Sequence, residues 1–206
     1  MAEDFGSRVA DREIIIGVVG LGYVGLPLAI AYAESGFRTV GFDVDPELVA
    51  ALNRGASHIG DVSSERVGAM VALDRFEAAS TPARLAEVDV VFICVPTPFD
   101  KAKTPDLSFV RAATHTVAEV LRPGMLVILQ STTYPGTTTE IVQPVLEERG
   151  LRAGVDFHLA FSPERVDPGN AIWTVHNTPK VVGGLTPACT QRAAPCSRQR
   201  WTTRAS

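Results

Sequence analysis

The chain has 206 residues and a net charge of −4, with 46% hydrophobic and 20% charged residues. This composition is typical of a soluble globular protein and excludes disorder, collagen and coiled coil. The acidic balance and the lack of a basic stripe argue against nucleic acid and anionic membranes as partners. No apolar stretch reaches the roughly 18 residues of a transmembrane helix. The first residues do not have the basic-then-apolar pattern of a signal peptide, so we expect a cytoplasmic protein.

Strand and helix patterns alternate along the chain. Continuous apolar runs predict strands at 14–19, 38–42, 76–79, 89–95, 125–130, 157–161 and 180–182. Helical patterns are found at 24–35, 46–53, 65–73, 108–121 and 137–149, and Thr81 with Pro82 opens a shorter helix. Thr137 and Glu140 have the spacing of a capping box for the last of these helices. Alternating strands and helices imply crossover connections, which predicts an α/β fold with a doubly wound parallel sheet.

The pattern changes near residue 189. From Cys189 to Ser206 the chain has four arginines and no acidic residue, and it shows neither helical nor strand periodicity. We therefore expect an N-terminal extension over 1–13, a Rossmann-like domain over 14–188 and an unstructured tail over 189–206. The cysteines and histidines have no metal-ligand spacing, so we predict no metal site.

A glycine-rich turn follows the first predicted strand. Gly20, Gly22 and Gly25 fit the GxGxxG pattern at the start of a predicted helix, and Asp43 ends the next strand. This is the complete dinucleotide-binding fingerprint, in which the helix start favours the anionic pyrophosphate. Asp43 can accept hydrogen bonds from the ribose and repels a 2′-phosphate, which favours NAD over NADP. A methyltransferase also uses such a turn and acid, and remains the alternative at this stage.

Three further polar loops each follow a predicted strand. They are Val-Pro-Thr-Pro at 95–98, Gln-Ser-Thr-Thr-Tyr-Pro-Gly-Thr-Thr at 130–138 and Phe-Ser-Pro-Glu-Arg-Val-Asp-Pro-Gly-Asn at 161–170. Ligands of open α/β sheets bind at the carboxyl ends of the strands, so these loops are placed to line a pocket. The alternative is that proline and threonine only shape turns, which would explain the composition of each loop taken by itself. It does not explain why all three leave strand ends.

Together these segments resemble the UDP-glucose/GDP-mannose dehydrogenase family, within it the UDP-N-acetylhexosamine 6-dehydrogenases, from about residue 14 to about residue 185. The resemblance implies a two-step oxidation of the carbon 6 alcohol of a UDP-sugar to the uronic acid, with two NAD per turnover, in polysaccharide biosynthesis. We expect UDP-GlcNAc or UDP-ManNAc as the substrate, with UDP-glucose as the remaining alternative.

The resemblance also implies roles for individual residues. It places Thr97 against the cofactor, Thr132 at the nicotinamide with the water used in the chemistry, and Glu164 in general acid/base work or water activation. A salt bridge to Arg165 or another basic residue is the structural alternative for Glu164. Arg165 and Val166 match positions that contact the sugar nucleotide. The pyrophosphate turn comprises Gly20, Gly22, Tyr23, Val24 and Gly25, and Asp43 binds the ribose.

The chain departs from the family pattern in two ways. The basic residue that often follows the ribose-binding acid is missing from residues 45–48. The family's nucleophilic cysteine, its catalytic lysine and its asparagine belong to a central helix and a second domain, and none of Cys94, Cys189 and Cys196 stands in the cysteine motif. We therefore expect a truncated form with no second domain and no dimer-forming helix, although the full-length family forms homodimers. It should bind NAD and yield at most traces of NADH. The alternative is an NAD-binding module or partner subunit without turnover of its own.

Overall fold

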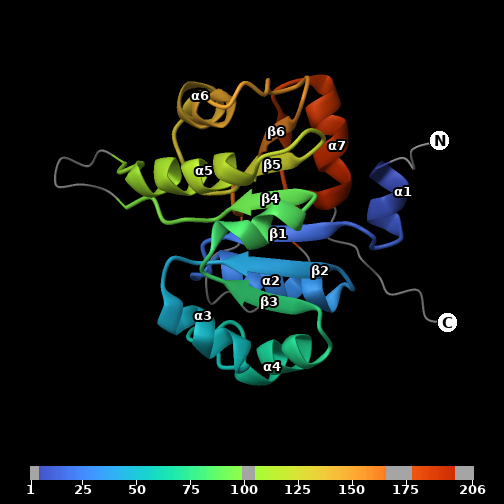
Figure 1. Cartoon of the computed structure of the whole chain (residues 1–206), viewed down its shortest axis with the longest axis vertical. Coiled ribbons are helices and arrows are strands. Elements are labelled where there is room, and N and C mark those ends of the chain that lie inside the picture. The colour runs from blue at the N-terminus through green and yellow to red at the C-terminus, as the bar shows by residue number, and fades with distance from the viewer. Residues whose placement is uncertain (1–4, 99–104, 166–177, 198–206) are drawn as a thin grey trace.

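The computed structural model describes residues 5–98, 105–165 and 178–197 (Figure 1). They form a seven-stranded sheet in the order β3-β2-β1-β4-β5-β6-β7. Strands β1 to β6 are parallel, and β7 pairs antiparallel with β6. The strands are β1 (Ile15–Val19), β2 (Arg38–Phe42), β3 (Phe76–Ala79), β4 (Val90–Ile93), β5 (Leu126–Leu129), β6 (His158–Phe161) and β7 (Gly183–Gly184). The doubly wound parallel sheet predicted from the sequence is confirmed, and only its last strand lies later than expected.

Helices cover both faces of this sheet. In β4, Val90 and Phe92 face a core shared with α2 and α7, whereas Val91 and Ile93 face a core shared with α5 and α6. Both faces are buried, as expected for parallel strands made of continuous apolar runs. The helices are α1 (Phe5–Ala10), α2 (Gly25–Glu34), α3 (Pro46–Asn53), α4 (Ser64–Ala72), the 3₁₀-helix η1 (Pro82–Glu87), α5 (Ser108–Val120), the π-helical turn η2 (Thr138–Val142), α6 (Gln143–Glu147) and α7 (Pro187–Ser197).

The predicted capping box of Thr137 and Glu140 is wrong. The Thr137 hydroxyl donates to the carbonyl of Tyr134 at 2.9 Å and does not cap the helix, which opens instead as the π-helical turn η2. By contrast, Asp45 caps α3, because its carboxylate accepts hydrogen bonds from the backbone N–H groups of Glu47 and Leu48.

The expectation of an unstructured tail is wrong for residues 189–197. They belong to α7, in which Cys189, Ala193 and Cys196 are buried. The spacing of these three residues forms one apolar helix face. Helix α1, within the expected N-terminal extension, packs against α7, and the Arg192 guanidinium lies 3.8 Å from the centre of the Phe5 ring. Residues 198–206 lie outside the described residues.

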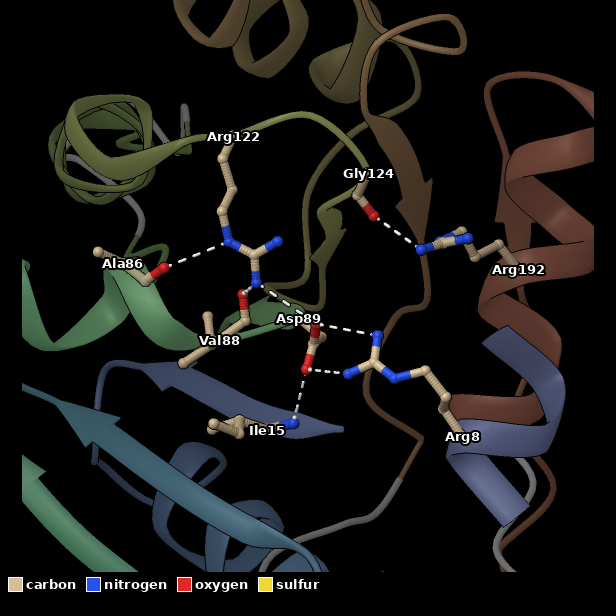
Figure 2. A network of polar contacts seen from close by, with 8 residues as sticks. All are labelled: Arg8, Ile15, Ala86, Val88, Asp89, Arg122, Gly124 and Arg192. Atoms are coloured by element: carbon tan, nitrogen blue, oxygen red, sulfur yellow. Dashed lines mark hydrogen bonds and ion pairs between the residues drawn. The ribbon is translucent and has the colours of Figure 1, made fainter. Parts of the chain in front are cut away.

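Asp89 joins several elements at the amino-terminal edge of the sheet (Figure 2). Its side chain is 14% exposed. The carboxylate accepts hydrogen bonds from the Arg8 guanidinium at 3.2 and 3.4 Å, from the Ile15 backbone N–H at 3.0 Å and from Arg122 at 3.3 Å. The Asp89 side chain, at the start of β4, therefore connects this strand to α1, to β1 and to the segment that leads into β5.

The arginines extend this network to the backbone. Arg122 also donates to the carbonyls of Val88 at 2.8 Å and Ala86 at 3.3 Å, and Arg192 of α7 donates to the carbonyl of Gly124 at 2.9 Å. These carbonyls lie in the segments before β4 and β5, so the arginines satisfy backbone acceptors where the strands begin.

Replacing Asp89 with alanine should destabilise the fold. The change leaves two guanidinium groups and the Ile15 N–H without their shared acceptor. Because the arginines are partly exposed, solvent reduces the penalty, and we expect a loss of about 2 kcal/mol in the free energy of unfolding. Urea unfolding measures this value. The control Glu119→Ala, at an exposed position of α5, should cost less than about 0.5 kcal/mol. Equal losses for the two variants would contradict the role given to Asp89.

Candidate functional site

The turn after β1 needs two of its glycines for its own geometry. Gly20 has a φ of +90°, in the left-handed region that favours glycine. A Cβ on Gly25 would lie 1.7 Å from the Gly20 carbonyl oxygen, so any side chain there would separate α2 from β1. Both glycines belong to the GxGxxG pattern that follows the first predicted strand.

Gly22 differs from these two glycines. A Cβ built on Gly22 would meet no atom within 4 Å, so packing within the protein does not require glycine there. The turn therefore has an open surface at Gly22 where a ligand can approach the backbone. No side chain caps α2 at Val24, and the free N–H groups of a helix start are suited to binding an anion. Tyr23 is exposed and Val24 packs partly against the core.

Asp43 lies beside the same turn. Its carboxylate accepts hydrogen bonds from the Leu21 N–H at 2.8 Å and from the Asp45 N–H at 3.1 Å. The first bond joins the end of β2 to the glycine turn after β1. The structure thus brings the acid and the glycines together at the carboxyl edge of the sheet.

The loops after β4 and β5 are tied to each other. The Ser131 hydroxyl donates to the carbonyl of Val95 at 2.7 Å, and the Thr97 hydroxyl donates to the carbonyl of Thr132 at 2.7 Å. Thr97 and Thr132 are therefore neighbours, as the predicted site requires, and Thr132 is exposed at the edge of the sheet. These bonds run from side chain to backbone, which fixes the relative position of the two loops.

Glu164 connects the third loop to the same edge. Its side chain is 11% exposed and that of Lys180 is 5% exposed, with 3.3 Å between Lys180 Nζ and Glu164 Oε2. Gln130 Nε2 donates to the same oxygen, and the Arg165 backbone N–H donates to Oε1 at 2.7 Å. Glu164 does form a salt bridge, but with Lys180. Arg165 is an exposed residue, and Val166 lies outside the described residues.

Sequence reasoning missed Gln130, Ser131 and Lys180 as parts of this site. Gln130 and Ser131 stood inside the quoted loop, where a polar side chain directly after an apolar strand was the available signal. Lys180 had no such signal, because its contact with Glu164 spans 16 residues and depends on the fold.

Two of the described cysteines, Cys94 and Cys196, lie in surroundings that keep the thiol unreactive. Burial raises the pKa of the Cys94 thiol to about 12, and it raises that of Cys196 to about 12 as well. Both thiols therefore stay protonated near neutral pH, whereas a nucleophile needs the thiolate. The expectation that Cys189 and Cys196 are mobile tail residues is wrong, because both are buried in α7.

Among residues 5–98, 105–165 and 178–197, no group of three or more histidine, cysteine and acidic side chains is arranged to hold a metal ion. Within the same ranges, no helix has both the length and the apolar character needed to cross a membrane.

Comparison with known proteins gives consistent matches. A UDP-N-acetyl-D-mannosamine dehydrogenase from Pyrococcus horikoshii is 39% identical over 171 residues, which are 82% of this chain and 41% of that protein. A solved UDP-D-ManNAc dehydrogenase structure from the same organism has a TM-score of 0.84 at 38% identity, over 90% of this chain and 44% of that one. A solved NDP-N-acetyl-D-galactosaminuronic acid dehydrogenase structure from Methanosarcina mazei has a TM-score of 0.83 at 33% identity. The match covers 98% of this chain and 46% of that one.

The chain thus spans less than half the length of these relatives. Residues 14–198 match the sequence model of the UDP-glucose/GDP-mannose dehydrogenase family, NAD binding domain. The match includes the residues of α7, so the family resemblance continues past the point near 185 where the sequence motifs end. The chain belongs to the UDP-glucose/GDP-mannose dehydrogenase family, and its described residues form the NAD-binding domain of that family.

Proposed function

We propose that this chain binds NAD along the carboxyl edge of its sheet, as part of an enzyme that oxidises carbon 6 of a UDP-N-acetylhexosamine. The observation that carries this proposal is the linkage of Asp43, the glycine turn and the loops after β4, β5 and β6 along one edge. In doubly wound sheets this edge is where dinucleotides bind.

The adenosine and pyrophosphate halves of NAD have separate partners in this proposal. Asp43 accepts hydrogen bonds from the ribose, beside the end of β2. The pyrophosphate lies over Gly22, where the backbone has no neighbour that a side chain would meet, and faces the first N–H groups of α2. The bare backbone at Gly22 supports this placement, because the packing gives no other reason for a glycine.

The nicotinamide half then lies over the loops after β4 and β5. NAD, when bound, supplies the hydride acceptor for the alcohol. Thr132 is exposed there, and its hydroxyl can hold a water molecule or a substrate oxygen. The bond from Thr97 to the Thr132 carbonyl keeps the Thr132 backbone in place. Glu164 presents a carboxylate from the neighbouring strand end, and Arg165 and Val166 remain proposed contacts of the sugar nucleotide.

The relatives support an N-acetylhexosamine substrate. Three relatives that match at 33–39% identity are named for UDP-N-acetylmannosamine or for an N-acetylgalactosaminuronic acid, and a UDP-N-acetyl-mannosamine dehydrogenase structure from Staphylococcus aureus matches at 31%. Solved structures named for GDP-mannose and UDP-glucose match at 29% and 32%. We propose UDP-ManNAc or UDP-GlcNAc as the substrate of the whole protein.

Asp43→Ala should weaken NAD binding by about 10- to 100-fold, because it removes charge-assisted hydrogen bonds to the ribose. Isothermal titration calorimetry of this chain with NAD and NADP measures both affinities. The control Glu47→Ala, two residues after the cap of α3, should leave NAD binding unchanged. Equal affinity of the unmodified chain for NAD and NADP would count against Asp43 as the ribose-binding residue.

Gly22→Ala should leave the fold intact and weaken NAD binding by at least about tenfold, since a methyl group would occupy the path of the pyrophosphate. The melting temperature should change by less than about 2 °C, because the added Cβ meets no atom. Gly60→Ala is the matched control, as a Cβ there also meets nothing within 4 Å. If the two variants bind NAD equally well, the pyrophosphate does not lie over Gly22.

The substrate proposal is tested on a form of the protein that includes the second half found in its relatives. We expect two NADH per UDP-ManNAc or UDP-GlcNAc, and much slower reduction of NAD with UDP-glucose and GDP-mannose. Absorbance of NADH measures the rate with each sugar nucleotide. A clear preference for UDP-glucose would refute the N-acetylhexosamine assignment.

A further inference from the structure

The Glu164 carboxylate is held by donors on three sides. Gln130 and Lys180 both reach Oε2, and the Arg165 backbone N–H reaches Oε1. The carboxyl side chain is 11% exposed and the lysine side chain 5%, so solvent screens their attraction weakly. A buried carboxylate that accepts several hydrogen bonds, one of them from a cation, is stabilised in its charged form.

Gln130 adds a second, independent indication. The residue is buried, and its Oε1 has no hydrogen-bond partner among the described residues. Turning the amide over would place this oxygen against Glu164 Oε2, so the observed orientation satisfies the carboxylate and leaves the amide oxygen unpaired. Buried polar atoms are normally paired, and the exception here serves the carboxylate.

Two titratable neighbours of this pair remain neutral near neutral pH. Cys94 at the end of β4 and Tyr32 of α2 both lie close enough to interact electrostatically with Glu164. Burial raises the pKa of Cys94 to about 12, and it raises the pKa of Tyr32 well above its usual value. Arg165 contributes its backbone N–H to Glu164, and its residue is exposed. The pair of Glu164 and Lys180 therefore lies beside a thiol and a phenol that carry no charge near neutral pH.

We propose that Lys180 and Gln130 are positioning residues that keep Glu164 ionised and fixed at the nicotinamide end of the site. Held in this way, Glu164 carries no proton to donate and acts as an oriented acceptor whose charge Lys180 balances. This inference refines the role of Glu164. Its test with NAD and NADH rests on the proposed function.

The first test needs no cofactor. Carbon-13 NMR of the chain labelled at its glutamate carboxyls follows Glu164, whose signal is identified by its loss in Glu164→Gln. Lys180→Met should move the midpoint of its titration upward by at least about one pH unit, because burial then opposes ionisation without a cation. Gln130→Met should move the midpoint by less, and Lys180→Arg should restore the midpoint of the unmodified chain.

The control is Arg152→Met, which breaks the exposed ion pair with Asp156 and should leave the Glu164 midpoint unchanged. An unmoved midpoint in both Lys180→Met and Gln130→Met would overturn the proposal.

Loss of folding in Lys180→Met would itself be informative. When the pKa of a carboxyl group is higher in the folded than in the unfolded state, the fold loses stability as the pH rises from the unfolded value, about 4.3 for glutamate, through the folded one. Lys180→Met should therefore be more stable at pH 5 than at pH 8, and the double variant Lys180→Met/Glu164→Gln should be stable at both. A double variant as unstable as Lys180→Met would contradict the pairing.

The second test separates a positioning role from a purely structural one. The nicotinamide ring is cationic in NAD and neutral in NADH, so a nearby carboxylate favours NAD when it is charged. In Lys180→Met, the affinity ratio of NAD to NADH should rise by about threefold or more between pH 5.5 and 8.5, as Glu164 loses its proton. It should stay flat in the unmodified chain, in Lys180→Arg and in Glu164→Gln.

The outcomes of the two tests are distinct. A moved NMR midpoint with a flat cofactor ratio would overturn the positioning role and leave a structural ion pair. If the unmodified chain binds neither NAD nor NADH, the proposed function fails, while the NMR titration still decides whether Lys180 and Gln130 hold Glu164 ionised.

Discussion

The site depends on the close contact between Gly25 and the carbonyl of Gly20. This contact leaves no room for a side chain, and it sets the position of α2 relative to the end of β1. A Cβ on Gly25 would also lie 3.3 Å from Cys94 Cβ, and one on Gly20 would lie 3.0 Å from the Cys94 carbonyl oxygen. The end of β4 is thus fixed by the same contact, and with it the start of the loop that carries Thr97.

The two edges of the sheet use charge in different ways. At the amino-terminal edge, Asp89 binds two arginines that remain partly exposed, and the bonds run to backbone groups where strands begin. That arrangement joins elements and contributes to stability. At the carboxyl edge, the Lys180 side chain is 5% exposed, against 32% for Arg8 and 40% for Arg122, and the pair of Lys180 and Glu164 lies beside loops that leave an open surface. A buried pair costs more desolvation than an exposed one, so its place beside a candidate site favours a functional reason for keeping it.

The sequence predicts the sheet well because its strands are buried on both faces and read as unbroken apolar runs. The turn of Gly20 and Gly25 is predictable too, since glycine is required there by a positive φ and by a close helix–strand contact. The sequence pattern did not predict helix α7, because Arg192 and Pro195 interrupt the apolar spacing of its buried residues. The two glycines of β7 have no side-chain pattern at all. The pairing of Lys180 with Glu164 arises only when the chain returns to the sheet, which no local pattern encodes.

Three successive residues at the end of β5 serve three different purposes. Gln130 turns toward Glu164, Ser131 bonds to the backbone at the end of β4, and Thr132 is exposed. The backbone N–H groups of Gln130 and Ser131 both donate to the Ile93 carbonyl, and the chain bends at Ser131 as it leaves β5. A one-residue shift of register that put Ser131 in the place of Gln130 would set a hydroxyl against Glu164 and Thr132 against the end of β4. The parallel pairing of β5 with β4 and β6 prevents that shift, and in this way the buried sheet determines which polar group reaches the open edge.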